Sequence, residues 1–198
     1  YKGVSAAYRP ELDASHLDYI RELYQLPERF ILCISNNKPH KNVLQLVRAY
    51  CHSSVEIPLV LACPVDHEMI HIAEVFGKKH RLYFIRFVED SHLPALYSMT
   101  DLFVYPSTYE GFGLPPLEAL ACGAPVMVAR TSSLPEVVGR HALFMNPHDY
   151  QDMAQVLEGA MANPGRLKDL LSGALEHVQT FSWDKMAKQT LEVYERCQ

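Results

Sequence analysis

Short apolar runs alternate with helical stretches along most of the chain, and this alternation constrains the fold more than any other feature of the sequence. The runs are four to eight residues long, and most of their residues are apolar rather than alternately apolar and polar. Strands of a parallel sheet have this character because helices bury both of its faces. The predicted strands span residues 29–35, 58–63, 81–88, 101–107, 125–129 and 142–145. We therefore predict an α/β fold, a doubly wound, Rossmann-like parallel sheet of about six strands.

Polar residues that can accept hydrogen bonds from a first helical turn precede several of the helical stretches. Asn42, Asp66 and Ser91 are predicted to begin helices in this way, and Gly77 is predicted to end the second of them. Further helices are predicted over residues 115–122, 149–162, 164–180 and 182–196.

Composition and charge narrow the class of protein. The 198 residues are 48% hydrophobic and 21% charged, which are values typical of globular proteins. The net charge is −5 and Lys and Arg do not cluster, so nucleic acid is not an expected partner. No apolar run is long enough for a transmembrane helix. The five cysteines include no C-x-x-C pair, and we interpret Cys33, Cys63 and Cys122 as reduced core residues of a cytosolic protein.

Three loops with unusual chemistry follow predicted strands. They are "SNNKPHKN" (35–42), "RFVEDSH" (86–92) and "PSTYEGFGLPP" (106–116). In a doubly wound sheet, ligands bind at the carboxyl ends of the strands. We therefore expect the three loops to converge in one cleft.

The segment from Tyr109 to Val126, "YEGFGLPPLEALACGAPV", holds the most informative pattern. Gly111 and Gly113 permit positive φ and let backbone N–H groups approach a ligand closely. The two prolines that follow suit the first turn of a helix, whose free N–H groups and positive dipole end can bind an anion.

Two glutamates flank this turn. Glu118 lies about one turn into the predicted helix, and an ionised carboxylate there could accept two hydrogen bonds from a vicinal diol such as that of ribose. Glu110 precedes the turn and would reach a different part of the ligand. Phosphate in the middle with hydroxyl groups at both ends describes a nucleotide sugar. A Gly-rich strand-to-helix turn with two solvated acids is the alternative, and these residues alone leave it open.

Longer stretches of the chain resemble a known family. "YPSTYEGFGLPPLEALACGAPV" is similar to the E-x7-E segment of retaining glycosyltransferases of family 4, which have the GT-B fold. The similarity continues through "TSSLPEVVG" (131–139), "FMNPHD" (144–149) and "FSWDKMAKQTLEVYERC" (181–197). Upstream, "NKPHKN" (37–42) resembles the basic loop of the family and "LPALYSMTDLFVYPS" (93–107) its approach to the fourth strand. The resemblance covers the chain from about residue 29 to its end.

The resemblance implies that this chain is the C-terminal, donor-binding lobe of a two-lobe enzyme. Residues 1–28 would form the interlobe connection and a leading helix, and residues 29–180 the nucleotide-sugar-binding domain. Residues 181–198 would form a helix that crosses back to an absent N-terminal lobe. We expect such a lobe to bind the donor without transferring the sugar by itself.

The resemblance also implies roles for individual residues. Glu118 would bind the nucleotide ribose, and Glu110 would contact the transferred sugar. Lys41 would neutralise the diphosphate leaving group, which makes Glu110 and Lys41 the expected catalytic residues. The remaining donor contacts would come from Gly111, Phe112, Gly113, Leu114, Asn36, His40, Phe87 and Val88.

Two positions depart from the family pattern. Ser35 and Asn36 stand where a Gly-Arg or Gly-Thr pair is frequent, so a second cation is missing there; Lys38, His40 or the asparagine amide would have to compensate. Arg86 stands where glycine is common and could either point outward or reach the nucleotide. Both departures leave the nucleotide base open.

The family further implies the reaction and its partners. A hexose-type sugar would move, with retention and without a metal or other cofactor, from a nucleoside-diphosphate sugar to a hydroxyl of a glycan or lipid-linked glycan. The acceptor would bind through the missing lobe. We expect the full enzyme in the cytoplasm, where it could also associate peripherally with the inner face of the membrane.

Three further interpretations were weighed against this one. "HEMIH" (67–71) matches the H-E-x-x-H pattern of zinc hydrolases, with His67 and His71 as ligands and Glu68 as base. Apolar residues on the opposite side of that helix predict that both histidines face water, so a zinc hydrolase is a distant alternative. A non-catalytic nucleotide-sugar module and an epimerase of the same fold are the other two.

Two tyrosines near the predicted cleft were assigned no role in binding. We expect Tyr97 and Tyr105 to pack in the core.

Overall fold

The computed structural model of the protein describes residues 2–36 and 38–196. Six strands form one fully parallel sheet in the order β3-β2-β1-β4-β5-β6. The strands are β1 (Ile31–Ile34), β2 (Leu59–Ala62), β3 (Leu82–Phe84), β4 (Leu102–Tyr105), β5 (Val126–Ala129) and β6 (Leu143–Met145). The predicted α/β fold is therefore confirmed. The third strand is much shorter than predicted, since it ends before Ile85 and the chain bends into a loop.

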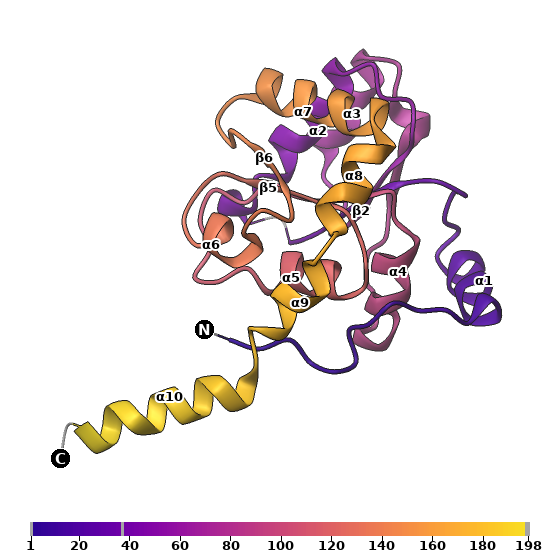
Figure 1. The fold of residues 1–198 in the computed structure, drawn as a ribbon. Helices are drawn as coiled ribbons and strands as arrows, with labels where there is room; N and C mark the ends of the chain where they lie inside the picture. The colour runs from indigo at the N-terminus through magenta and orange to yellow at the C-terminus, as the bar shows by residue number, and fades with distance from the viewer. Residues whose placement is uncertain (1, 37, 197–198) are drawn as a thin grey trace.

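Helices cover both faces of the sheet (Figure 1). One face packs against α2 (Val43–His52), α3 (His67–Val75) and α7 (Tyr150–Ala162). The other face packs against α1 (Ala14–Leu23), α4 (Leu93–Met99), α5 (Leu114–Ala121), α6 (Leu134–Val138) and α9 (Ala174–Gln179). Each face of the sheet has its own hydrophobic core, and successive residues of a strand point into the two cores alternately. Ile31 and Cys33 belong to the first core and Leu32 to the second.

The strand order reverses its direction between β1 and β4. From β1 the chain builds outward through β2 to β3, and from β4 it builds in the opposite direction through β5 to β6. In a doubly wound sheet, ligands bind in a crevice outside the carboxyl ends of the strands at such a reversal. The predicted loops 35–42 and 106–116 begin at this crevice.

Several predicted helix boundaries are wrong for identifiable reasons. The single helix predicted over 164–180 is two helices, α8 (Pro164–Leu171) and α9, because Gly173 between them takes a left-handed conformation with φ of 76°. Ser91 lies in a 3₁₀ turn (Asp90–His92), and α4 begins after it. Asp66 caps α3 as predicted, by accepting a hydrogen bond from the Glu68 amide.

The N-terminal segment contacts the chain where α10 (Trp183–Arg196) begins. Gly3 lies against the backbone of Ser182 and Trp183, and a Cβ at Gly3 would overlap those atoms. From this contact α10 projects away from the rest of the molecule (Figure 1), and none of its residues is buried. The division at residues 28 and 180 and the return of α10 to another lobe stay predictions.

Two further findings concern the core and the helices. Cys33, Cys63 and Cys122 are buried free thiols, as predicted, whereas Cys197 lies outside the described residues. Within residues 2–36 and 38–196, no helix has both the length and the apolar character needed to cross a bilayer.

Candidate functional site

Hydrogen bonds join the loops that leave β1, β4 and β6. The carbonyl oxygen of His40 accepts hydrogen bonds from the Thr108 amide at 2.7 Å and from Ser107 Oγ at 2.9 Å. Asn42 has φ of 59°, and its side chain does not cap α2, contrary to the prediction. Its Nδ2 instead donates to the carbonyl oxygens of Pro106 at 3.2 Å and Pro147 at 2.7 Å. The predicted convergence of loops 35–42 and 106–116 is therefore confirmed.

Lys41 and Glu110 form an ion pair in this crevice. Lys41 Nζ lies 2.7 Å from Glu110 Oε1, and the two side chains are only 16% and 15% exposed. Burial opposes ionisation of Glu110, but hydrogen bonds from Lys41, Ser107 and Tyr105 outweigh it, so the pKa of the carboxyl lies below its usual value. The pair is thus charged, preorganised and largely shielded from water.

Tyr105 completes a triangle with this pair. Its hydroxyl accepts a hydrogen bond from Lys41 Nζ and donates one to Glu110 Oε1, both at 2.8 Å. Burial and the nearby Glu110 charge raise the pKa of Tyr105 far above its usual value, so the hydroxyl keeps its proton. Tyr105 is buried in the core, as predicted, but its hydroxyl also holds the ion pair, which was not predicted. A tyrosine as the last residue of an otherwise wholly apolar core strand was the available signal.

The turn between the two glutamates is held from outside by the loop after β5. Ser132 Oγ accepts a hydrogen bond from the Glu110 amide at 3.0 Å. Ser133 Oγ lies 3.0 Å from the Glu110 carbonyl oxygen and 2.8 Å from that of Phe112, and it can donate to either. Sequence analysis gave these two serines no role, although "TSSLPEVVG" was part of the resemblance.

The two glycines of the turn differ. Gly113 has φ of 103°, and a Cβ there would lie 2.6 Å from Leu134 Cδ2, so the turn requires glycine. Gly111 does not adopt the positive φ that glycine permits, and a Cβ there would meet nothing within 4 Å. Gly111 therefore leaves open space above the backbone, which a ligand could occupy.

Helix α5 begins directly after this turn. Leu114 is its first residue, prolines follow as predicted, and no side chain caps its first amides. The positive end of the helix dipole can therefore attract an anion. Phe112 is buried, with its ring 5.8 Å from that of Phe181, so it can offer a ligand only its backbone.

Glu118 lies half-buried on α5, on the side that faces α4 and the N-terminal segment. Tyr97 Oη is 3.5 Å from Glu118 Oε2, and Tyr8 also hydrogen-bonds to this carboxylate. Burial raises the pKa of Glu118 to about 6, against the effect of the two hydroxyls. Tyr97 packs in the core, as predicted, but its hydroxyl also reaches the site, and sequence analysis missed Tyr8 altogether.

The third predicted loop lies beside a cavity at the carboxyl ends of β1, β2 and β3. The cavity has a volume of about 230 Å³. Arg86, Phe87 and Val88 line it together with Ser35 and Asp90. The Phe87 side chain is 75% exposed, so an aromatic face is available there. In this cavity the structure brings residues 86–88 close to Ser35, in the loop after β1.

The positions of Asn36 and His40 do not by themselves assign either residue a role in the site. Asn36 is exposed, and its Oδ1 accepts a hydrogen bond from the Lys38 amide. His40 is half-buried and contributes its carbonyl oxygen to the loop contacts described above. Their roles in donor binding stay predictions.

The helix with the H-E-x-x-H pattern is not built as a metal site. His67 and His71 are exposed on α3, and Glu68 pairs with Arg48 at 2.9 Å. Over residues 2–36 and 38–196, no three His, Cys, Asp or Glu side chains are grouped as metal ligands would be. The opposite side of the helix is buried at Met69 and Ala73, so the prediction that both histidines face water is confirmed.

Comparison with known proteins gives consistent matches. Residues 21–177 match the family described as "Glycosyl transferases group 1". The chain is 37% identical over 195 residues to a serotype-specific mannosyltransferase WbdA of Escherichia coli, covering 94% of this chain and 24% of that protein. It is 32% identical over 198 residues to O-antigen chain mannosyltransferase B of Escherichia coli, covering 96% and 52%. The chain thus spans between a quarter and about half of these relatives.

Solved structures share the fold. A structure of HepE from Anabaena in complex with UDP and glucose superposes with a TM-score of 0.84 at 22% identity, covering 99% of this chain and 56% of that one. Sucrose-phosphate synthase from Thermosynechococcus elongatus gives a TM-score of 0.82 at 24% identity, covering 99% and 51%.

Proposed function

Because the chain belongs to the glycosyl transferases group 1 family, we propose that it is the donor-binding lobe of a retaining glycosyltransferase of family 4. The donor would be a nucleoside-diphosphate sugar, and the acceptor a hydroxyl of a glycan or lipid-linked glycan. Both relatives named above are mannosyltransferases, which favours a mannosyl residue as the transferred sugar. The complex of HepE with UDP and glucose supports a nucleotide and a sugar in this type of lobe.

The observation that carries the proposal is the buried Lys41–Glu110 pair beside the uncapped N-terminus of α5. One cation and one helix end face the same crevice, where a diphosphate would be attracted to both. The carboxylate next to them can accept hydrogen bonds from sugar hydroxyls. A sugar attached to a diphosphate therefore suits this crevice. The diphosphate would lie at the positive charges, and the sugar hydroxyls would lie at the carboxylate.

The reaction breaks the bond between the anomeric carbon and the diphosphate oxygen. Negative charge grows on the diphosphate as the bond breaks, and the Lys41 ammonium and the positive end of the α5 dipole stabilise that charge. The acceptor oxygen forms the new bond on the same face of the sugar, and its proton passes to the departing diphosphate. Lys41 and the helix end supply the positive charge, so we propose a reaction that is independent of metal.

The two glutamates have different tasks in this scheme. Glu110 is ionised and fixed by Lys41 and Tyr105, so it can orient the sugar. Glu118 lies on the far side of the turn, where it can accept hydrogen bonds from the ribose diol. Phe87 and Val88 would contact the base in the cavity of about 230 Å³.

Calorimetric titration of the chain with UDP, GDP, ADP and their sugar conjugates, without added metal, tests the proposal. We expect one nucleotide to bind, and Glu118→Ala to weaken that binding. Failure of every nucleotide to bind, or equal affinity in Glu118→Ala, would contradict it. Binding without sugar transfer by the full-length protein would favour a non-catalytic nucleotide-sugar module instead.

A further inference from the structure

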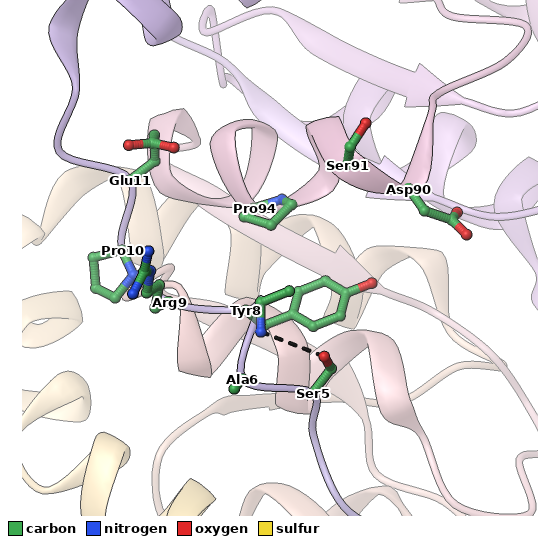
Figure 2. A pocket seen from close by; sticks show the side chains of 10 residues that line it. Ser5, Ala6, Tyr8, Arg9, Pro10, Glu11, Asp90, Ser91 and Pro94 are labelled. Atoms are coloured by element: carbon green, nitrogen blue, oxygen red, sulfur yellow. Dashed lines mark hydrogen bonds between the residues drawn. The ribbon is translucent and has the colours of Figure 1, made fainter.

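The segment of residues 5–11 passes along α4 and walls an open cavity of about 760 Å³, together with Asp90, Ser91 and Pro94. Figure 2 shows the Tyr8 ring reaching from this segment across the cavity, on the side of Asp90. The ring centroid of Tyr8 lies 6.2 Å from that of Tyr97, and the Tyr8 hydroxyl hydrogen-bonds to Glu118. Tyr8, which precedes the first strand by more than twenty positions, thus contacts Glu118, the residue predicted to bind the ribose.

The segment is anchored on both sides of Tyr8, so this contact is a fixed part of the fold. The Tyr8 amide donates to the Ser5 carbonyl oxygen at 3.0 Å, which closes a turn. The Glu11 amide donates to Ser98 Oγ on α4 at 2.9 Å. The Tyr8 ring itself packs against the core that contains Tyr97 and Leu117.

Glu118 depends on neutral partners for its orientation. In the described part of the chain it forms no ion pair, and its hydrogen-bond donors are the hydroxyls of Tyr8 and Tyr97. Asp90 and Cys122 also face it; the Asp90 charge disfavours its ionisation, and Cys122 stays protonated because burial raises the pKa of its thiol to about 12. Loss of one hydroxyl would therefore not be compensated by a cation.

We propose that Tyr8 is a positioning residue of the donor site, which holds the Glu118 carboxylate so that it can accept both hydroxyls of the nucleotide ribose. A carboxylate offers about four lone-pair directions. The two tyrosine hydroxyls use two of these directions, and the remaining ones suit a vicinal diol. This inference rests on the proposed function, because it assumes a ribose at Glu118.

The test compares ribonucleoside and 2′-deoxyribonucleoside diphosphates. For the nucleotide that the wild-type chain binds, affinities of both forms are measured by calorimetry in wild type, Tyr8→Phe and Tyr83→Phe. Phenylalanine keeps the ring of Tyr8 and removes only the hydroxyl. Tyr83 is a matched control, because its 37% exposed side chain lies on β3 and forms no hydrogen bond among the described residues.

We expect the wild-type chain to prefer the ribonucleotide, and Tyr8→Phe to reduce that preference about tenfold, since a hydrogen bond to a charged group is worth about one power of ten in affinity or more. A defect in folding or packing alone would weaken both nucleotides equally and leave the preference unchanged. Tyr83→Phe should behave as wild type.

A second readout needs no ligand. Carbon-13 NMR of the Glu118 carboxyl should show a higher pKa in Tyr8→Phe than in wild type, because the lost hydrogen bond favours the ionised form. An unchanged ribose preference together with an unchanged Glu118 titration would overturn the role of Tyr8 alone. Absence of any nucleotide binding by the wild-type chain would overturn the proposed function and this role with it.

Discussion

Tyr105 gives the Lys41–Glu110 pair a fixed geometry. Its hydroxyl accepts a hydrogen bond from the lysine and donates one to the carboxylate, so both charged groups are held by one neutral side chain. Oε1 of Glu110 accepts the hydrogen bonds from both Lys41 Nζ and the Tyr105 hydroxyl. Glu110 is thereby ionised through its contacts rather than through exposure to water.

Replacement of Tyr105 by phenylalanine tests this arrangement. We expect Tyr105→Phe to lower sugar transfer by the full-length enzyme about tenfold, because a hydrogen bond to a charged group is worth about 1.5 kcal/mol or more. Nucleotide affinity should change much less, since Lys41 and the α5 amides remain. Steady-state kinetics and calorimetry on the same variant separate the two effects, and an unchanged kcat would contradict the prediction.

Glu118 makes the folded state sensitive to pH. Burial raises its pKa from 4.5 to about 6, so the folded state binds this proton more tightly than the unfolded state does. The free energy of unfolding should therefore fall as the pH rises from 4.5 through 6, and the cost persists above that range. Since the group is only half-buried, the cost is about 1–2 kcal/mol at most.

The variant Glu118→Gln removes this charge. We expect it to be more stable than wild type by about 1 kcal/mol at pH 7.5 and to lose the advantage near pH 4.5, while it binds nucleotide more weakly. Urea unfolding at the two pH values measures the stability. Equal stability of the two proteins at pH 7.5 would show that burial of the Glu118 charge does not destabilise the fold.

At the scale of elements, the turn before α5 combines one structural glycine with one glycine that leaves space for a ligand. Gly113 needs its left-handed conformation and has no room for a side chain beside Leu134, whereas Gly111 faces open space. The two positions are two residues apart and therefore make a matched pair for mutation.

We expect Gly113→Ala to destabilise the fold by about 1–2 kcal/mol or more, from backbone strain and the clash with Leu134. Gly111→Ala should fold with nearly wild-type stability and yet weaken donor binding, because the new methyl group occupies the space above the turn. Thermal unfolding and nucleotide titration of both variants check the prediction. The opposite pattern would mean that the ligand does not approach Gly111.

Elements defined by local chemistry were predictable from the sequence, and those decided by distant contacts were not. The apolar strands and the Pro-started α5 carry their own signals, so both were found. Asn42 could not be assigned correctly, since its side chain serves the carbonyl oxygens of Pro106 and Pro147, far away in sequence. The same holds for Tyr8, whose partner Glu118 is 110 residues further along the chain.

At the scale of the whole molecule, α10 is the element that the rest of the fold supports least. None of its residues is buried, although Leu191, Val193 and Tyr194 are large apolar side chains with more than half of their surface exposed. The interpretation that another lobe covers this helix follows from the family resemblance.

Removal of α10 tests how much the domain depends on it. Truncation after Ser182 should change the free energy of unfolding by less than about 1 kcal/mol, since little apolar surface of the helix is buried here. Truncation after Gly173 is the control, because it also removes the buried Ala174 and Val178 of α9 and should destabilise the domain clearly. A large loss of stability in the shorter truncation would show that α10 packs on the domain in solution.

The contact of Gly3 with Ser182 and Trp183 bears on how such domains can be exchanged between proteins during evolution. Because positions 3 and 182 are in contact, the chain enters and leaves this domain at neighbouring points. A unit of this kind can be spliced into another polypeptide at one point, or have its order permuted, without a gap for a linker to bridge. Recombination can therefore move this lobe among longer chains and leave its core intact.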